Sequence, residues 1–178
     1  MTPERSRPTR RRHHHLTSHR GSGCGATPVP SGECGPAPHL RRDHDRQAYC
    51  WGNGNVGQTG DGKTSNRLWP KVPVAGGLDF TRVSAGHFHA CGETTNKRAH
   101  CWGWNLEGAI GDGTKTMRLS PVPVAGGLLF SQVSAGSSHT CGRTPAAVAY
   151  CWGWNGYGKL GDGTFSDQLT PSPVAGSD

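Results

Sequence analysis

Short stretches that interleave apolar and polar residues occur twice in the chain. They read "FTRVSAG" at 80–86 and "FSQVSAG" at 130–136, and each ends on glycine. This pattern predicts half-buried β-strands followed by turns. "HFHACGET" and "SSHTCGRT" predict a second strand, and "RAHCWGW" and "VAYCWGW" predict a third. "PVPVA" at 121–125 predicts a fourth strand on a sheet edge, because proline cannot donate to a central strand.

These strands belong to a repeat. Cys50, Cys101 and Cys151 each begin Cys-Trp-Gly, at intervals of 51 and 50 residues. The units, the third of them partial, are 51–100, 101–150 and 151–178. Four short antiparallel strands recurring about every 50 residues are typical of the blades of a β-propeller. We therefore predict an all-β fold, a partial β-propeller of four-stranded antiparallel blades.

Composition and charge refine this prediction. Apolar residues make up only 32% of the chain and glycine accounts for 28 residues, which argues against a helical bundle and favours strands joined by tight turns. Residues 1–48 carry nine Lys/Arg and four Asp/Glu, a net charge of +5, whereas residues 49–178 carry only +2. The basic, low-complexity segment 1–48 is predicted to be disordered. Nucleic acid is a candidate partner through this segment alone.

The glycine-rich motifs carry a family resemblance. Trp102–Thr114 and Trp152–Thr164 match the pattern W-G-x-N-x-x-G-x-L-G-D-G-T, with Ile110 at the leucine position of the first, and Val133–Cys141 matches V-S-A-G-x-x-H-T. Over residues 49–178 the chain resembles the regulator of chromosome condensation repeat family. The resemblance implies a seven-bladed propeller, whereas this chain supplies about two and a half blades. It is therefore expected to be a fragment, a truncated product, or a part that closes with further blades or by self-association.

Cysteines recur at a fixed spacing. Cys91 and Cys101 are ten residues apart, as are Cys141 and Cys151, and each pair flanks a predicted turn. Residues placed symmetrically about a hairpin turn face each other at a separation that suits a disulfide. We predict both disulfides, with reduced core thiols as the alternative. A zinc site is disfavoured, because the short cysteine spacing of a zinc knuckle is absent.

Three cysteines remain. Cys24 and Cys34 share the ten-residue spacing without a following Trp-Gly, and Cys50 would face Leu40, so it is left over or pairs with Cys34. Disulfides favour an extracellular or exported location. The first twenty residues, however, contain no apolar stretch of the kind that a secretory signal needs. The sequence leaves the compartment open, and it contains no apolar run long enough for a transmembrane helix.

Recurring Asp and His residues are assigned structural roles. Asp61, Asp112 and Asp162 stand in Asp-Gly turns, where the carboxylate caps backbone N–H groups. A phosphate-binding loop is disfavoured because we expect no strand before these turns, no helix after them and no Lys-Ser/Thr pair at their end. A calcium loop is disfavoured because each turn has a single Asp. His89 and His139 precede the strand cysteine by two residues. Their repetition predicts a hydrogen bond at each blade corner rather than a general base.

The tryptophans fall into two groups. Those of the Cys-Trp-Gly motifs are predicted in the core between blades: Trp51, Trp102 and Trp152. Trp104 and Trp154 occupy a place where the first unit has Asn53, so we expect them on an exposed rim. Exposed aromatic side chains favour binding, which makes these two candidate partner contacts. The alternative is that each ring lies over the glycine-rich loop.

We predict a non-enzymatic scaffold that binds a protein partner, of unknown identity, through its blade loops, with no cofactor and no metal. An enzyme is disfavoured, because the repeats contain no clustered carboxylates and no nucleophile–base pair. The resemblance implies two alternatives, guanine-nucleotide exchange and chromatin association. Exchange-active relatives carry a specialised insertion, which is not visible here, and the Gly-Trp-Arg-His-Thr signature of the plant ultraviolet-B photoreceptors is replaced by "GHFHA" and "GSSHT". A secreted inhibitor or a cell-surface interaction protein is the remaining alternative.

Overall fold

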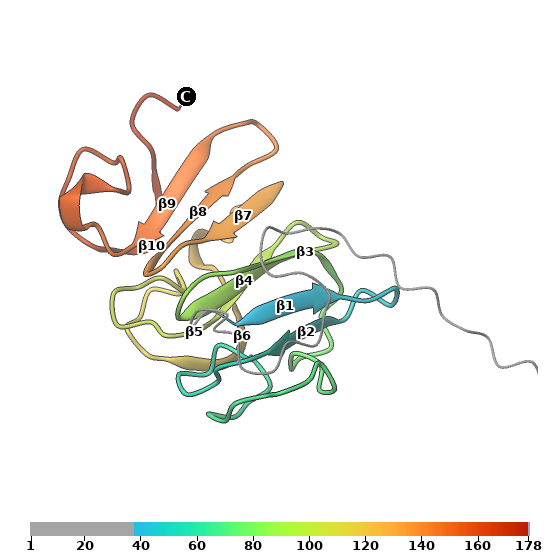
Figure 1. Cartoon of the computed structure of the whole chain (residues 1–178). Helices are drawn as coiled ribbons and strands as arrows, with labels where there is room; N and C mark the ends of the chain where they lie inside the picture. Colours follow the sequence, from blue (N-terminus) through green and yellow to red (C-terminus); the bar gives the residue numbers. More distant parts are fainter. Residues whose placement is uncertain (1–37, 178) are drawn as a thin grey trace, which may run out of the picture. The chain divides into compact units, whose positions relative to one another are not determined.

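The computed structural model describes residues 38–177, which contain ten β-strands and two short 3-10 segments (Figure 1). The strands are β1 His39–Arg42, β2 Ala48–Trp51, β3 Phe80–Ala85, β4 His89–Thr94, β5 Ala99–Gly103, β6 Arg118–Pro123, β7 Gln132–Ala135, β8 His139–Arg143, β9 Ala149–Gly153 and β10 Gln168–Pro173. The 3-10 segments are η1 Ala125–Gly127 and η2 Gly156–Gly158. None of the helical segments in this part of the chain is long and apolar enough to span a bilayer.

Two antiparallel sheets of four strands make up most of the fold. The first blade has the strand order β3-β4-β5-β6, the second blade has the order β7-β8-β9-β10, and β1 pairs with β2 in an N-terminal hairpin. Pro121 of β6 and Pro171 of β10 lie on edge strands, where the missing N–H costs no hydrogen bond within the sheet. The predicted all-β partial propeller is confirmed, and the sheets do not close into a ring.

The fourth strand is displaced from its predicted position. β6 begins at Arg118, ahead of the predicted stretch 121–125, and ends at Pro123. One further bond to β5 follows, from the Val124 N–H to the Ala99 carbonyl at 3.0 Å, and the next amide, that of Ala125, donates instead to the Gly111 carbonyl at 2.9 Å. The edge strand is therefore set by the glycine-rich loop that precedes it as well as by its own sequence.

The first unit also differs from the sequence prediction. β1 lies within the segment 1–48, for which the sequence predicts disorder, and it pairs with β2 so that Leu40 faces Cys50. Leu40 packs against a buried apolar cluster, an anchor that the average composition of the segment does not reveal. In place of a fourth strand, the first unit makes only isolated bridges at Arg67 and Pro73. The basic stretch upstream of β1 lies outside the described residues.

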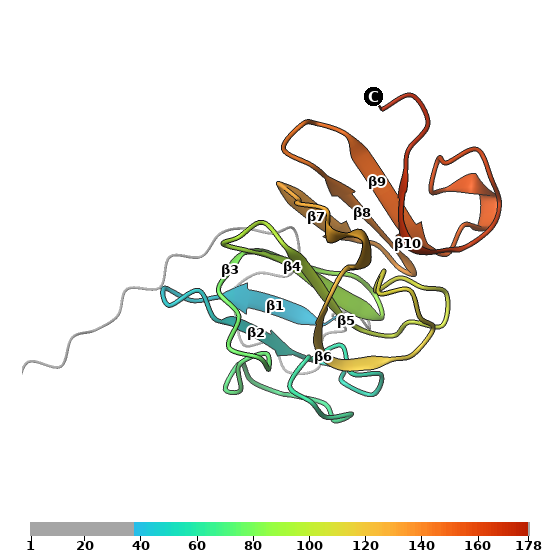
Figure 2. The same cartoon turned by 180° about the vertical axis from the view of Figure 1, so that it is seen from behind.

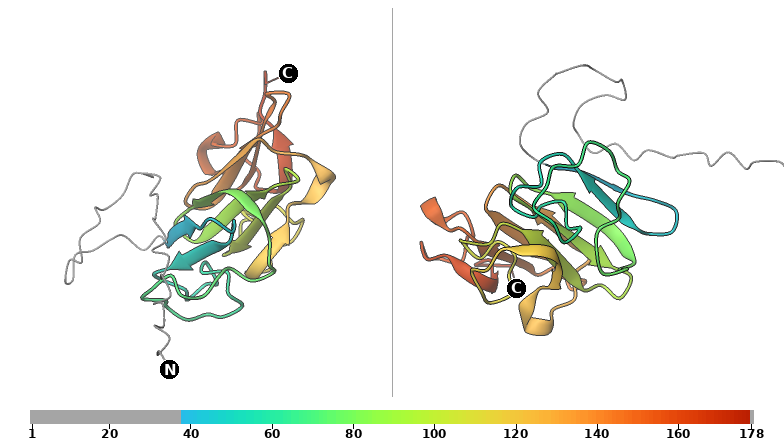
Figure 3. Two further views of the ribbon diagram at one scale, coloured as in Figure 1. Left: turned by 90° about the vertical axis from the view of Figure 1, so that its right-hand side faces the viewer. Right: turned by 90° about the horizontal axis from the view of Figure 1, so that it is seen from below.

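Buried clusters lie on both faces of the first blade. Successive strand residues point to opposite faces, so Cys101 belongs to one cluster and Trp102 to the other. The cluster toward the second blade contains Cys91, Ala99, Cys101, Ile110, Val124, Phe130, Val133 and Trp152. The cluster toward the N-terminal hairpin contains Ala48, Cys50, Val74, Phe80, Ala90 and Trp102. Figure 2 shows β7 lying against β3 and β4, and Figure 3 shows the hairpin, the first blade and the second blade in succession.

Candidate functional site

Each blade is joined to the preceding loop by the tryptophan of its Cys-Trp-Gly motif. Trp152 is fully buried, and its indole N–H donates to the Ala109 carbonyl at 3.0 Å. Trp102 is equally buried and donates to the Gln58 carbonyl at 3.1 Å. The loop approaches this closely because it carries glycine: a Cβ on Gly111 would lie 2.5 Å from the Trp152 indole nitrogen. The predicted place in the core is confirmed for these two tryptophans, but it is wrong for Trp51, which is half-buried and stacks on His39.

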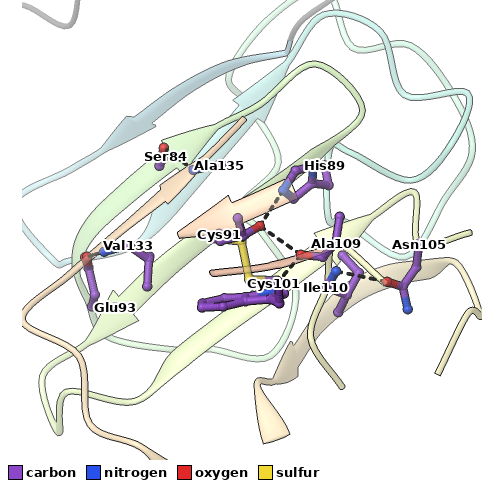
Figure 4. The surroundings of a disulfide bond; sticks show 12 residues. Ser84, His89, Cys91, Glu93, Cys101, Asn105, Ala109, Ile110, Val133 and Ala135 are labelled. Carbon is purple, nitrogen blue, oxygen red and sulfur yellow. Dashed lines mark hydrogen bonds between the residues drawn. A yellow bond between two sulfur atoms is a disulfide. The ribbon is translucent and has the colours of Figure 1, made fainter. Parts of the chain in front are cut away.

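His89 makes a hydrogen bond between the two blades (Figure 4). Its Nε2 lies 2.7 Å from Thr140 Oγ1, and that hydroxyl donates to the Ala109 carbonyl at 2.8 Å. Because the hydroxyl proton is used in this way, His89 Nε2–H is the donor to Thr140. Burial, with a smaller contribution from His139, lowers the pKa of His89 from 6.5 to about 4. The imidazole is therefore neutral at pH 7 and acts as a structural donor.

His139 does not repeat this contact within the described residues. It is half-buried, and its ring packs against Gly136, where a Cβ would lie 2.6 Å from the ring. Its Nδ1 has no hydrogen-bond partner among residues 38–177. Burial, together with the nearby charge of Lys159, lowers the pKa of His139. The bond at the first blade requires the threonine of a following blade, and residues 38–177 contain no blade beyond the second.

Side chains of the first blade bind two backbone amides of β7 (Figure 4). Glu93 accepts from the Val133 N–H, and Ser84 Oγ accepts from the Ala135 N–H at 3.0 Å. Burial raises the pKa of Glu93, and the bond from Val133 opposes this rise. β7 is an edge strand, so these bonds occupy amides that no neighbouring strand pairs.

The structure contains both predicted disulfides. Cys91 on β4 is bonded to Cys101 on β5, and Cys141 on β8 is bonded to Cys151 on β9 (Figure 4 shows the first). The Cα atoms of each pair are 4.1 Å apart, because the two cysteines lie directly opposite in the strand register. Cys50 is buried and is not bonded to another described cysteine, and burial raises the pKa of its thiol. Cys24 and Cys34, which share the ten-residue spacing, lie outside the described residues.

Removing the Cys91–Cys101 disulfide is expected to lower the free energy of unfolding by about 2 kcal/mol, because the bond restricts the unfolded chain over a short loop. Urea denaturation of C91A/C101A beside the wild type measures this change. Cys50→Ala is the matched control, since it removes a buried thiol but no cross-link. A double variant no less stable than Cys50→Ala would contradict the expectation.

The three Asp-Gly turns contain the predicted carboxylate caps. In each turn the Asp Oδ1 accepts a hydrogen bond from the backbone N–H two residues later, at 3.0–3.1 Å: Asp61 from Lys63, Asp112 from Thr114 and Asp162 from Thr164. In each turn the other carboxylate oxygen, Oδ2, accepts from a side chain six residues after the aspartate: Arg67, Arg118 or Gln168. Partial burial alone would raise the pKa of Asp112, but the bonds from Thr114 and Arg118 outweigh it and hold the pKa below its ordinary value. Sequence reasoning missed these donors, although their spacing repeats.

Sequence reasoning also missed a buried asparagine at the centre of each later loop. Asn105 is fully buried; its amide nitrogen donates to the Thr114 and Thr116 carbonyls at 3.0 and 3.1 Å, and its Oδ1 accepts from the Ile110 N–H at 2.9 Å. Asn155 makes the same set of contacts in the third unit. The signal was available, since Asn follows Trp-Gly-Trp in both units.

Gly57–Thr64 reads "GQTGDGKT", which matches the phosphate-loop pattern G-x-x-x-x-G-K-T, so the expectation that no Lys-Ser/Thr pair ends these turns is wrong for the first unit. The structure argues against that function. No helix follows the motif in the described residues. The amides that would hold a phosphate are already used, since Gly60 donates to the Gly57 carbonyl, Gly62 to the Leu119 carbonyl and Lys63 to Asp61.

Two turns and two loops meet at one end of the blades, and we call this surface the rim: residues 86–88, 104–117, 136–138 and 154–167. The Trp104 N–H donates to the Phe88 carbonyl at 3.0 Å, and the Trp154 N–H donates to the Ser138 carbonyl at 2.9 Å. Of the nine large apolar side chains exposed among the described residues, five lie on the rim: Leu106, Met117, Trp154, Tyr157 and Phe165. The rim therefore carries most of the exposed large apolar side chains in this part of the chain; three others, Leu68, Trp69 and Val72, lie close together in the first unit.

The two rim tryptophans differ in their surroundings. Trp154 is 37% exposed, as expected for a residue on the rim. Its ring also lies over Gly156, as the alternative interpretation expected. Lys159 Nζ lies 3.8 Å from the centroid of the Trp154 ring. Trp104 is half-buried, and its indole N–H donates to Glu107 Oε2 at 2.8 Å. Among the described residues, no group of three or more His, Cys, Asp and Glu side chains is arranged to hold a metal ion.

Comparison with known proteins places the chain in a family. The Regulator of chromosome condensation (RCC1) repeat matches residues 45–92, 98–142 and 148–178, and a second model of the repeat matches 80–109 and 130–159. The chain is 34% identical over 89 residues to the ultraviolet-B receptor UVR8 of Arabidopsis thaliana, covering 49% of this chain and 20% of the receptor. It is 33% identical over 87 residues to human alsin, covering 48% of this chain and 5% of alsin.

Solved structures agree on the fold. Prp20p of Saccharomyces cerevisiae superposes with a TM-score of 0.68 at 18% identity, over 83% of this chain and 37% of Prp20p. Human WBSCR16 superposes with a TM-score of 0.65 at 22% identity, over 76% of this chain and 37% of WBSCR16. This chain thus spans a fifth or less of the curated relatives named here and little more than a third of these structures. The repeat matches cover most of the chain from residue 45 to its end, and the protein belongs to the regulator of chromosome condensation repeat family.

Proposed function

We propose that this protein is a non-enzymatic scaffold that binds a protein partner through the rim. The observation that supports the proposal is the concentration of exposed apolar side chains there, with Leu106, Trp154, Tyr157 and Phe165 open to solvent. Aromatic side chains carry a large share of binding energy where a partner excludes water from them. The opposite end of the blades, formed by turns 95–98 and 144–148, exposes no aromatic side chain.

The rim is also a stable platform. Its loops are held by the buried Asn105 and Asn155 and by the Asp-Gly turns, and the His87 N–H donates to the Gly136 carbonyl, which links the turns of the two blades. A surface that is ordered before binding loses less conformational entropy when the partner docks. Among relatives, Prp20p is described by its binding to Gsp1p and histones, which is a precedent for protein binding on this fold.

Site-specific photo-crosslinking tests the proposal. Benzoylphenylalanine is placed on the rim at Leu106 or Tyr157 and, as matched controls, at Thr95 or Ala146 on the opposite end of the blades; all four side chains are exposed. We expect a discrete protein adduct in native cells from the rim positions and none from the controls. Adducts from the controls but not from the rim, or from neither end, would contradict the proposal.

A further inference from the structure

A pocket of about 290 Å³ opens on the rim. Val56, Phe88, Trp104, Glu107 and Ser138 line it. Val56 comes from the loop after β2, Ser138 from the turn between β7 and β8, and the other three from the first blade. The pocket therefore exists only where successive repeats are packed together.

The walls of the pocket combine aromatic rings with a carboxylate. The centroids of the Phe88 and Trp104 rings are 6.5 Å apart, and the ring planes are inclined by 46°. Glu107 accepts from the Trp104 indole N–H through Oε2, and its Oε1 has no donor among residues 38–177. An aromatic face attracts a cation through its quadrupole, and a carboxylate beside it adds charge and a hydrogen-bond acceptor.

In the second blade, a lysine ammonium already lies over Trp154, the tryptophan that corresponds to Trp104. Lys159, five residues after Trp154, places its ammonium 3.8 Å from the centroid of that ring. In the first blade the residue five positions after Trp104 is Ala109, which is fully buried. Among residues 38–177, Trp104 thus has an acidic neighbour but no Lys or Arg side chain over its ring.

We infer that the pocket binds an arginine side chain from a peptide segment of the partner protein, with the guanidinium on the Trp104 ring and paired with Glu107. The inference rests on the proposed function, because it names what the partner presents to the rim. Arginine fits better than lysine, since its planar guanidinium can stack on a ring and donate to a carboxylate at the same time.

A peptide titration of the whole chain tests the inference. The indole N–H signals of ¹⁵N-tryptophan-labelled protein are followed by NMR, and the signal that disappears in Trp104→Phe identifies Trp104. The probes are acetyl-Gly-Gly-Arg-Gly-Gly-amide and the same peptide with citrulline, which keeps the shape of arginine without its charge. We expect a saturable shift of the Trp104 signal with the arginine peptide, weakened by added salt, and no shift with the citrulline peptide.

Glu107→Gln removes the charge but keeps an oxygen that can accept from the Trp104 N–H. Its affinity for the arginine peptide is expected to fall about tenfold, the loss of one hydrogen bond to a charged group. Trp69→Phe, which alters an exposed tryptophan outside the rim, is the matched control and should bind as the wild type does. Unchanged positions of the other indole signals in Glu107→Gln verify its fold. Equal shifts with both peptides, or undiminished affinity of Glu107→Gln, would overturn the inference.

The two proposals can fail separately. Rim crosslinks that persist while the arginine peptide does not bind would leave a protein-binding rim without an arginine pocket. Specific binding of the arginine peptide without rim crosslinks would support the pocket and contradict the proposed function.

Discussion

Replacing Trp152 by alanine is expected to lower the free energy of unfolding by about 3–5 kcal/mol, because it leaves a cavity in the core between the two blades. Trp152 is fully buried, its ring lies 5.7 Å from that of Phe130 between centroids, and its N–H occupies the Ala109 carbonyl. Urea denaturation followed by far-ultraviolet circular dichroism, which does not depend on the deleted fluorophore, measures the change.

Trp51→Ala is the matched control for this prediction. Trp51 stands in the same motif of the first unit, but it is half-buried and stacks on His39, with ring centroids 5.5 Å apart. We expect the free energy of unfolding to fall by only about 1 kcal/mol, since a half-buried ring contributes less buried apolar area than a fully buried one. Equal losses at the two positions would contradict the assignment of Trp152 to the core between blades.

Acidification is expected to destabilise the junction between the blades through His89. Its folded-state pKa, about 4, lies below the unfolded value of 6.5, so the unfolded chain binds the proton more tightly. The stabilisation by neutral His89 is therefore fully present above pH 6.5 and is lost as the pH falls toward 4. The loss amounts to about 3 kcal/mol, since one pKa unit corresponds to about 1.4 kcal/mol.

Glu93 acts in the opposite direction at the same junction. Burial raises the pKa of Glu93, so protonation favours the folded state as the pH falls, and its contribution is lost as the pH rises through the raised pKa. The lowered pKa values of His100 and His139 act in the same sense as that of His89. Glu93→Gln removes the opposing contribution and should make the loss of stability between pH 6.5 and 4 steeper.

His89→Gln separates His89 from the other titrating groups. Glutamine retains an N–H donor for Thr140 but does not titrate. Thermal unfolding of the wild type and the variant at pH 7, 5.5 and 4 should show a smaller decrease of the melting temperature in the variant. Parallel decreases in the two proteins would contradict the lowered pKa of His89.

Local rules explain why the strands and disulfides could be predicted. The strand at 80–86 could be predicted from its alternating apolar and polar residues, and the edge strand from its prolines. The disulfides could be predicted from the ten-residue cysteine spacing, because it places the two cysteines opposite each other in a hairpin. The prediction that Cys50 faces Leu40 is confirmed for the same reason. Disorder over the whole of 1–48 does not hold for β1, because four residues with one apolar anchor leave no trace in an average over the segment.

Contacts between units could not be predicted in this way. The Thr140 hydroxyl lies between His89 of the preceding blade and the Ala109 carbonyl of the preceding loop, and only the packed blades bring these groups together. The same holds for Glu93. Its charge alone predicts solvent exposure, whereas the side chain is buried and accepts a hydrogen bond from the Val133 N–H of β7. Sequence reasoning identified Trp104 and Trp154 as candidates but did not find Glu107, Phe88 or Lys159 beside them.

The sequence by itself determined the repeat, the strand order within a blade, the cysteine pairing and the turn chemistry of the Asp-Gly loops, because each depends on residues close together in one unit. The tertiary structure decided that Trp51 is only half-buried whereas Trp102 and Trp152 are fully buried. It also decided the neutral state of His89 and the position of Glu107 beside the Phe88 and Trp104 rings at the rim pocket. Those features depend on the packing of one repeat against the next, and burial and electrostatic interactions follow from that packing rather than from the order of residues within a unit.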